Sequence, residues 1–511
     1  MGNGPLLLNL RTRRSAMNYV ASVGVSVASL AIGFIVTPYL VWWLGHERYG
    51  AARAVADWFG HFSILEAGVA GALAPMLASA LGRNDRHSLR RALHAGMRAY
   101  MVAAGVALVI AAVLTANAGR LVPVDPSLTR EVNNAFFVGL LSCGLMMLTP
   151  FQTLADAAQR GYVVSTLSFG QGILASALSL LFAHEGWGIP GQLAAIVLAQ
   201  GAFRLGLVLA TQPLMGGVLW VLAEPPDKET QRALWKLNPP SFLNTLAGRL
   251  GFYSDNIVIA LMIGPAHVMP FFITQRLASV AGTQLLGVGN ASWAAMAELH
   301  TLGRREDFNA RLLELTRLVG GLAIAALIPI AAYNGAFVTR WVGPEAFAGD
   351  WLTAVACLNA YLLALLALWG WCFGGTGKLG VVVPVTLTSA LLNIAVSIGA
   401  TWRFGLIGPL IGTLAAAVLV NIWAIPLLLH RHFGTSIPKL LGSALLPVLW
   451  GAPLGAITLW LSRRYPPSTL VPLLSEMAAA GLVLLICWWF LALRSAEREA
   501  FRERVRAVLR A

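Results

Sequence analysis

Charged residues are scarce in this sequence, and their scarcity excludes a water-soluble globular fold. Of 511 residues only 11% are Asp, Glu, Lys or Arg, whereas 58% are hydrophobic. The mean hydropathy is +0.72. A soluble domain carries about 25% charged residues, so this much apolar surface must face lipid. The sequence therefore predicts an all-α polytopic membrane protein.

Cysteine is also rare, and soluble-enzyme motifs are missing. The four cysteines lie singly inside apolar segments, and we interpret them as packing residues (Cys143, Cys357, Cys372 and Cys487). The stretch Gly374–Lys378 resembles a phosphate loop only superficially, because Leu379 stands where that motif requires Ser or Thr. We expect a transporter and not an enzyme, with no metal and no cofactor. An ion gradient, the membrane potential or the substrate gradient would then drive it.

Apolar segments long enough to cross a bilayer fill the chain. We predict about 14 transmembrane helices, at residues 17–44, 50–81, 92–116, 131–158, 162–183, 189–212, 238–263, 268–297, 312–333, 349–374, 379–402, 406–430, 438–462 and 470–493. The first run, Val20–Leu44, is too long for a signal-peptide core, which predicts a retained helix. The predicted loops on one side of the membrane hold about 23 Lys and Arg, and those on the other side hold about 7. Because cytoplasmic loops carry the excess of Lys and Arg, both termini are predicted in the cytoplasm.

Landmarks recur along the chain at a nearly constant spacing of 217 to 221 residues. The pairs are Leu44-Gly45 with Ile263-Gly264, Leu81-Gly82-Arg83 with Leu302-Gly303-Arg304, Val124-Asp125-Pro126 with Val342-Gly343-Pro344, Arg160 with Lys378, and Gly188–Gly191 with Gly405–Gly408. Six helices separate the copies, so both copies cross the membrane in the same sense. The pattern predicts two parallel-repeated six-helix bundles with a cavity between them.

The repeat and the polar stretch opening with Pro225-Pro226 set the expected domains. These are an N-terminal six-helix bundle (1–223), a cytoplasmic linker (224–237), a C-terminal six-helix bundle (238–435), two additional transmembrane helices (436–493) and a basic cytoplasmic tail (494–511). The tail is either a solvated surface helix or a helix lying on the anionic leaflet.

Several charged residues fall inside the predicted spans, where each would cost about 2.5–3.5 kcal/mol if it faced lipid. Polar residues recur at helical spacing and form stripes on one face of each of three predicted helices. From these stripes we predict two sets of functional residues. One set binds a headgroup (Arg53, Arg249, Arg276, Asn256 and Asn290), and the other couples transport to H⁺ or Na⁺ (Asp57, His61 and Asp255). Arginine suits a pyrophosphate because its planar fork makes two charge-assisted hydrogen bonds. Alternatively, Arg53–Asp57 and Arg249–Asp255 are structural pairs. For Glu66 we favour a structural role, and for Arg98 and Arg204 a side chain that reaches the membrane interface.

Five stretches together resemble a known family. The residues are Pro38 with Leu44–Gly50, Glu66-Ala67-Gly68, Asp255–Ile259 with Ile263-Gly264, Trp341–Phe347, and Gly377-Lys378 followed by Asn393 and Phe404–Gly408. In this order they resemble polysaccharide flippases of the Wzx type, in the multidrug/oligosaccharidyl-lipid/polysaccharide superfamily. Glu66 stands where the family usually carries Asp. The resemblance covers residues 17 to about 435.

The resemblance implies two six-helix bundles in a V that work by alternating access. The implied cargo is an undecaprenyl-pyrophosphate-linked oligosaccharide, flipped across the bacterial plasma (inner) membrane for synthesis of O-antigen, capsule or exopolysaccharide. In lipid-linked peptidoglycan precursor relatives, arginines of helices two and eight meet the pyrophosphate, and Arg53 and Arg276 match these by helix. Bilayer lipids, a polysaccharide polymerase and other assembly proteins are the implied partners, and nucleic acid is not among them.

Three other functions are compatible with such a chain. A cation-coupled multidrug exporter of the same superfamily usually has twelve helices and a carboxylate-lined cavity, which this sequence fits less well. A lipid-linked peptidoglycan precursor flippase has the same chemistry as the favoured function. A membrane-embedded glycosyltransferase or polymerase needs a long outside loop, and the longest one here is short, around Ala118–Arg130.

Overall fold

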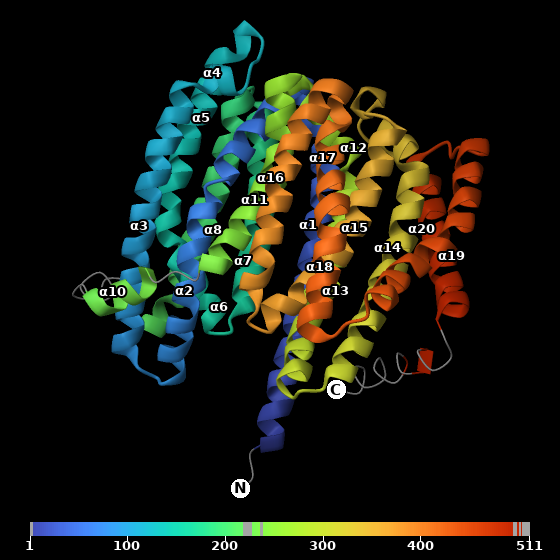
Figure 1. Cartoon of the computed structure of the whole chain (residues 1–511). Coiled ribbons are helices and arrows are strands. Elements are labelled where there is room, and N and C mark those ends of the chain that lie inside the picture. Colours follow the sequence, from blue (N-terminus) through green and yellow to red (C-terminus); the bar gives the residue numbers. More distant parts are fainter. Residues whose placement is uncertain (1–3, 218–226, 236–238, 494–497, 500–501, 503–511) are drawn as a thin grey trace. The chain divides into compact units, whose positions relative to one another are not determined.

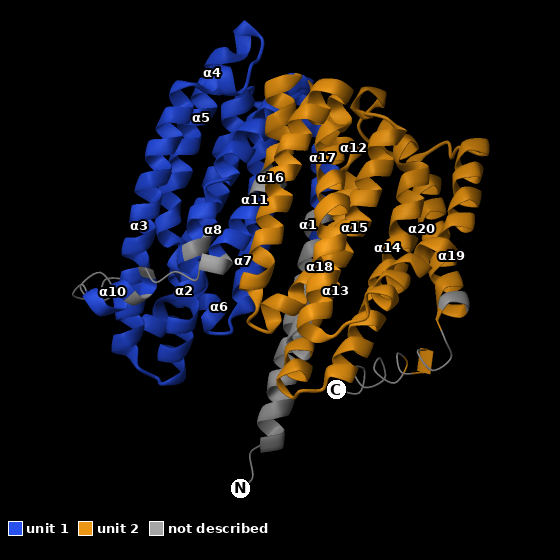
Figure 2. Ribbon diagram, viewed as in Figure 1, with its two compact units in different colours: residues 1–249, 264–266, 510–511 blue, residues 250–263, 267–509 orange. Residues whose placement is uncertain are grey.

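Every element of secondary structure that the computed structural model describes is helical, which confirms the predicted all-α fold (Figure 1). The structure describes residues 4–217, 227–235, 239–493, 498–499 and 502. The described helices form two compact units (Figure 2). Unit 1 holds the residues up to Arg249 together with Gly264–Ala266, and unit 2 holds Leu250–Ile263 and the residues from His267 onward. The domain limits drawn from the sequence stay a prediction.

Unit 1 is built from long helices with short breaks. They are α1 (Gly4–Gly60), α2 (Ser63–Gly82), α3 (Arg86–Ala116), α4 (Ala118–Leu121), α5 (Thr129–Leu145), α6 (Thr149–Ala157), α7 (Gly161–His184), α8 (Gly188–Met215) and α10 (Lys228–Trp235). In the predicted linker, α10 docks on this unit, because Leu234 is buried in one cluster with Leu73, Leu93 and Phe151. Helix α11 (Pro239–Met262) crosses from unit 1 into unit 2 at Arg249.

Unit 2 continues with helices that are broken at more places. They are α12 (Val268–Thr274), α13 (Arg276–Thr301), α14 (Arg305–Trp341), α15 (Asp350–Gly375), α16 (Leu379–Phe404), α17 (Gly408–Ala416), α18 (Ile422–Phe433), α19 (Ile437–Arg464) and α20 (Leu470–Cys487). One-turn π-helices interrupt the chain at Ala417–Asn421 and Trp488–Ala492. The predicted tail, 494–511, lies almost wholly outside the described residues.

Nine helices among the described residues are long and apolar enough to span a bilayer, or ten if the bent pair within Ala31–Gly82 counts as one span. One of them, Leu379–Phe433, contains two predicted spans, which meet at Gly405. Helix α11 covers one further predicted span, and α12 with α13 covers another, but polar stripes make these helices less apolar. The chain is thus a multi-pass membrane protein, and the count of fourteen stays a prediction.

Backbone turns recur at the predicted spacing. Residues with left-handed backbone pair as Gly45 with Gly264, Gln159 with Gly377, Gly188 with Gly405 and Gly216 with Gly434. Short 3₁₀ turns begin at Pro126 and Pro344. One sequence pairing was wrong: Asn84 (φ 54°), and not Gly82, takes the place of Gly303 (φ 70°). Asn adopts this left-handed conformation more readily than most residues, so the same turn forms without glycine.

The second predicted span, 50–81, is broken. Helix α1 passes a kink at Gly45 (φ 74°), ends at Gly60, and α2 begins at Ser63. The Ser63 hydroxyl donates to the Gly60 carbonyl at 2.7 Å, and His61 Nδ1 lies 2.9 Å from the Asp57 carbonyl oxygen. The Ser63 hydroxyl supplies a hydrogen bond to a carbonyl at the break, whereas the Asp57 carbonyl also accepts the His61 backbone N–H at 3.3 Å. Side-chain bonds of the first kind are one way in which a broken span is tolerated.

A buried polar network joins four helices of unit 1. Arg204 on α8 lies 3.6 Å from the Glu66 carboxylate on α2, and the two side chains are 7% and 20% exposed. Arg204 also donates to Gln152 at 2.8 Å, Thr149 donates to the Glu66 carboxylate at 3.0 Å, and Tyr100 donates to the Glu66 carbonyl at 3.1 Å. Arg204 therefore does not reach the interface as the sequence suggested. Pairing with Glu66 is the alternative to facing lipid.

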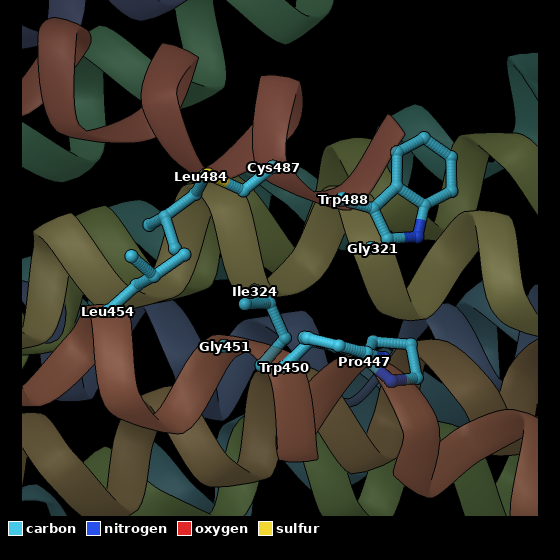
Figure 3. Close-up of a pocket in the computed structure, with 9 residues that line it drawn as sticks. All are labelled: Gly321, Ile324, Pro447, Trp450, Gly451, Leu454, Leu484, Cys487 and Trp488. Atoms are coloured by element: carbon cyan, nitrogen blue, oxygen red, sulfur yellow. The ribbon is translucent and has the colours of Figure 1, made fainter. Parts of the chain in front are cut away.

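The two additional helices pack on α14 through glycine and proline. The ring of Trp488 lies against Gly321, and Pro447 lies against Gly320. Tyr361 donates to the Ala444 carbonyl, and Arg463 lies 3.6 Å from Asp350. The junction leaves a small apolar crevice, lined by Gly321, Ile324, Pro447, Trp450, Gly451, Leu454, Leu484, Cys487 and Trp488 (Figure 3). Such a lining suits hydrocarbon and offers nothing to an anionic headgroup.

Enlarging Gly321 should loosen the additional helices. A Cβ atom there would lie 2.3 Å from ring atoms of Trp488, whereas at Gly399 on α16 it would meet nothing within 4 Å. We expect Gly321→Ala to cost about 1–3 kcal/mol of the free energy of unfolding. The matched Gly399→Ala should be neutral or stabilising. Melting of the purified protein measures both, and equal melting temperatures would contradict this packing.

Removing Arg204 should strongly destabilise unit 1. Arg204→Ala leaves the Glu66 carboxylate in a mostly buried place without its nearest cation, and breaking such a pair costs about 3–5 kcal/mol. The double variant Glu66→Gln/Arg204→Met, which buries no charge, should recover most of that loss. Thermal unfolding in detergent compares them with Arg120→Ala, an exposed control. If Arg204→Ala melts like the control, the pair contributes nothing to stability.

Candidate functional site

Arg53 lies in the part of α1 that forms the first half of the second span. Its guanidinium carbon is 5.4 Å from the centre of the Tyr49 ring, and its Nη2 donates to the Tyr49 hydroxyl at 3.3 Å. Tyr49 is only 3% exposed, so the ring is a fixed support. A cation over an aromatic face is attracted by the ring quadrupole, and this attraction is larger where water is excluded. Tyr49 thus holds the Arg53 guanidinium in place.

Arg276 is the first residue of α13 and follows the break in the eighth span. Its guanidinium carbon lies 5.4 Å from the centre of the Phe272 ring, four residues earlier. The side chain is partly buried. The sequence placed Arg276 within one continuous helix, 268–297, whereas the structure ends α12 at Thr274 and restarts with Arg276. Only Gln275 separates the two helices, and its backbone keeps a right-handed helical conformation.

The two arginines do not occupy equivalent places in the repeat. Gly45 and Gly264 are 219 residues apart, as are Asn84 and Gly303 on the far side of the span. At this spacing Arg276 corresponds to Asp57, and Arg53 corresponds to Phe272. Each unit nevertheless shows the same local arrangement, an arginine over an aromatic ring one turn earlier, displaced by one helical turn.

The predicted ion-coupling residues of unit 1 lie beside Arg53. Asp57 is one turn further along α1 and attracts the Arg53 guanidinium electrostatically. His61 stands at the break. Because a carbonyl can only accept, the contact of its Nδ1 with the Asp57 carbonyl makes Nε2 the acceptor when the ring is neutral. The structure thus brings Arg53, Asp57 and His61 onto one stretch of a broken span.

The remaining predicted residues are distributed over α11 and α13. Arg249 belongs to unit 1 and attracts the Glu66 carboxylate there. Asp255 and Asn256, six and seven residues later on α11, belong to unit 2 and are partly buried. The Asn290 side chain lies outside the described part of the chain. The roles assigned to all these residues stay predictions, as does the cavity between the halves.

Sequence reasoning missed the residues that hold the two arginines. Tyr49 and Phe272 each precede an arginine by four positions, and that spacing places them one turn apart on the same helix face. This signal was available. Buried Thr274 and Asn334, which fix the break before Arg276, carry no local signal, because they lie 60 residues apart.

Comparisons with known proteins agree with this architecture. A sequence model for the family "Polysaccharide biosynthesis protein" matches residues 16–294, more than half of the chain. The chain is 22% identical over 440 residues to the uncharacterized membrane protein EpsK of Bacillus subtilis, covering 82% of this chain and 83% of EpsK.

Solved structures of transporters share the fold. The lipid II flippase MurJ in an inward closed conformation matches with a TM-score of 0.70 and 10% identity, covering 93% of this chain and 98% of MurJ. A multidrug resistance MATE family transporter in an inward-facing conformation matches with a TM-score of 0.59 and 15% identity, covering 79% of this chain and 97% of the transporter.

A third match is a transporter from Pyrococcus furiosus, whose binding pocket is described as reversed in polarity. It matches with a TM-score of 0.55 and 15% identity, covering 81% of this chain and 94% of that transporter. At these identities the matches show the fold, which is that of the multidrug/oligosaccharidyl-lipid/polysaccharide superfamily. The family match, which extends from the first span through both arginines, shows more: this chain belongs to the polysaccharide biosynthesis protein family.

Proposed function

We propose that this protein flips an undecaprenyl-pyrophosphate-linked oligosaccharide across the bacterial plasma membrane by alternating access. The observation that carries the proposal is the arginine held over an aromatic ring in each of the two units of a polysaccharide biosynthesis family member. The product of the step would be a lipid-linked oligosaccharide on the outer leaflet, ready for assembly into O-antigen, capsule or exopolysaccharide.

The chemistry of the arginines fits a pyrophosphate headgroup. Guanidinium is a planar cation that donates two parallel hydrogen bonds to phosphate oxygens. The Tyr49 and Phe272 ring centres each lie 5.4 Å from a guanidinium carbon, so each ring restricts its arginine side chain before a ligand arrives. A pre-ordered side chain loses less conformational entropy on binding, which raises affinity. The apolar hydrocarbon of such a lipid needs no polar partner and stays in the bilayer.

The alternative of a cation-coupled multidrug exporter is less well supported. The fold match to the MATE transporter covers 79% of this chain, whereas the match to MurJ covers 93%. Arginine at the predicted site repels the cationic drugs that a carboxylate-lined cavity attracts. A lipid-linked peptidoglycan precursor would satisfy the same arginines, so the sugar decides between the two flippase functions.

The compartment and the partners follow from the proposed cargo. A lipid-linked oligosaccharide is made on the cytoplasmic leaflet, where the basic loops of this chain are predicted to lie. Both termini would then be cytoplasmic. A polysaccharide polymerase and other assembly proteins on the far side are the proposed partners.

Replacing either arginine should strongly reduce export. Arg53→Ala and Arg276→Ala each remove charge-assisted hydrogen bonds worth about 1.5–3 kcal/mol, so we expect transport to fall about 10- to 150-fold. Lysine variants, which keep the charge but lose the fork, should retain intermediate activity. Surface polysaccharide per cell, normalised to protein level, measures the effect.

The matched control is Arg403→Ala. Arg403 also lies over a ring, 5.7 Å from the centre of Phe404, but it is exposed at the end of α16. Its loss should leave export unchanged. Unchanged polymer output from both Arg53→Ala and Arg276→Ala would remove the proposed headgroup contact.

A carboxylate should couple transport to an ion gradient. Wild-type protein in proteoliposomes should respond to an imposed pH or Na⁺ gradient, and Asp57→Asn or Asp255→Asn should abolish that response while keeping gradient-free exchange. Asp156→Asn, at an exposed position on α6, is the control that should keep the response. Coupling is excluded if wild-type transport ignores both gradients.

A further inference from the structure

Arg276 lies two residues beyond a threonine that is fixed from three directions. The Thr274 hydroxyl donates to the Ala346 carbonyl at 3.2 Å and accepts from the Ala348 N–H at 2.8 Å. The Thr274 carbonyl accepts from the Asn334 side chain on α14 at 2.8 Å. Thr274 and Asn334 are each 1% exposed. The end of α12 is therefore held by groups from α14 and from the loop that follows it.

Asn334 extends this network to a further helix. Its amide nitrogen also donates to the Thr353 hydroxyl on α15 at 2.9 Å, and Thr353 is 2% exposed. Its amide oxygen is buried and has no hydrogen-bond partner. Burying an amide oxygen without a hydrogen-bond partner costs free energy. Because Asn334 is nevertheless buried, we infer that its bond to the Thr274 carbonyl at the helix break explains an asparagine at this position.

The repeat shows what the network adds. At the 219-residue spacing Thr274 corresponds to Val55, which lies inside the unbroken stretch of α1. Asn334 corresponds to Thr115, whose hydroxyl donates to the Ala111 carbonyl of its own helix. In unit 1 the regular helix α1 alone positions Arg53. In unit 2 the arginine comes directly after a break at which the Thr274 carbonyl accepts from Asn334, so a side chain of α14 takes part in holding the backbone there.

We propose that Asn334 is the positioning residue for Arg276. By holding the Thr274 carbonyl, Asn334 sets the direction in which α13 leaves the break, and so sets where the Arg276 guanidinium meets an anionic headgroup. This inference rests on the proposed function, because it takes Arg276 to contact a pyrophosphate. Asn334 acts through Arg276 and does not touch the ligand.

A double-mutant cycle on the full-length protein in nanodiscs tests the proposal. The probe is undecaprenyl pyrophosphate, with uncharged undecaprenol as the control ligand. We expect Arg276→Ala to weaken pyrophosphate binding about 10- to 100-fold and Asn334→Ala about tenfold, and the double variant to bind no more weakly than Arg276→Ala alone. Neither variant should change undecaprenol binding. A purely structural role would instead make the two effects multiply.

Thr353→Val is the matched control for the network. It removes the hydroxyl that Asn334 contacts on α15 and leaves the bond to Thr274, so pyrophosphate affinity should stay within about twofold of wild type. If Asn334→Ala does not fold, Asn334→Asp enters the same cycle. It keeps the size of the side chain, and its carboxylate has no N–H for the Thr274 carbonyl.

The outcomes separate the two ideas. Wild-type affinity in the Asn334 variant, or multiplying losses in the double variant, overturns the positioning role while Arg276 keeps its headgroup contact. No loss in Arg276→Ala overturns the proposed headgroup contact and the positioning role with it. A tenfold loss in Asn334→Ala that vanishes in the Arg276→Ala background supports both.

Discussion

The absence of water inside a bilayer is the constraint on which this structure depends. Every backbone carbonyl and N–H in a span must find its partner within the protein. A continuous helix does this by itself, so each interruption needs a side chain to replace the missing bonds. Ser63 does so in the second span, and Asn334 does so in the eighth. Interruptions that are supported in this way lie beside Asp57 and Arg276, where the proposed chemistry occurs.

The two units share turns but differ in their buried polar groups. Unit 1 buries the Glu66–Arg204 pair, and at the repeat spacing Leu285, a buried leucine, stands in the place of Glu66. Unit 2 instead buries the neutral network around Asn334. A repeated scaffold explains the common turns, because each turn satisfies the same local backbone requirements.

The additional helices illustrate how little specific chemistry membrane packing requires. Gly320 and Gly321 let Pro447 and Trp488 approach the α14 backbone closely, and few polar contacts secure the junction. In lipid, apolar side chains gain little by leaving their surroundings, so close van der Waals packing and isolated hydrogen bonds supply the association. The resulting crevice is apolar.

Composition and periodicity by themselves determined that this chain is a multi-pass helical membrane protein with an internal repeat, because hydropathy and turn residues are local properties. The motifs placed it among polysaccharide flippases. The cost of charge in lipid marked the charged residues within the spans, and the chemistry of phosphate recognition led to the prediction that Arg53 and Arg276 are headgroup ligands. Only the tertiary structure decided that Arg204 pairs with Glu66, that Asn84 replaces a glycine turn, and that Asn334 holds the break before Arg276. These depend on residues distant in sequence, and a pairing between distant residues leaves no periodic signal in a single chain.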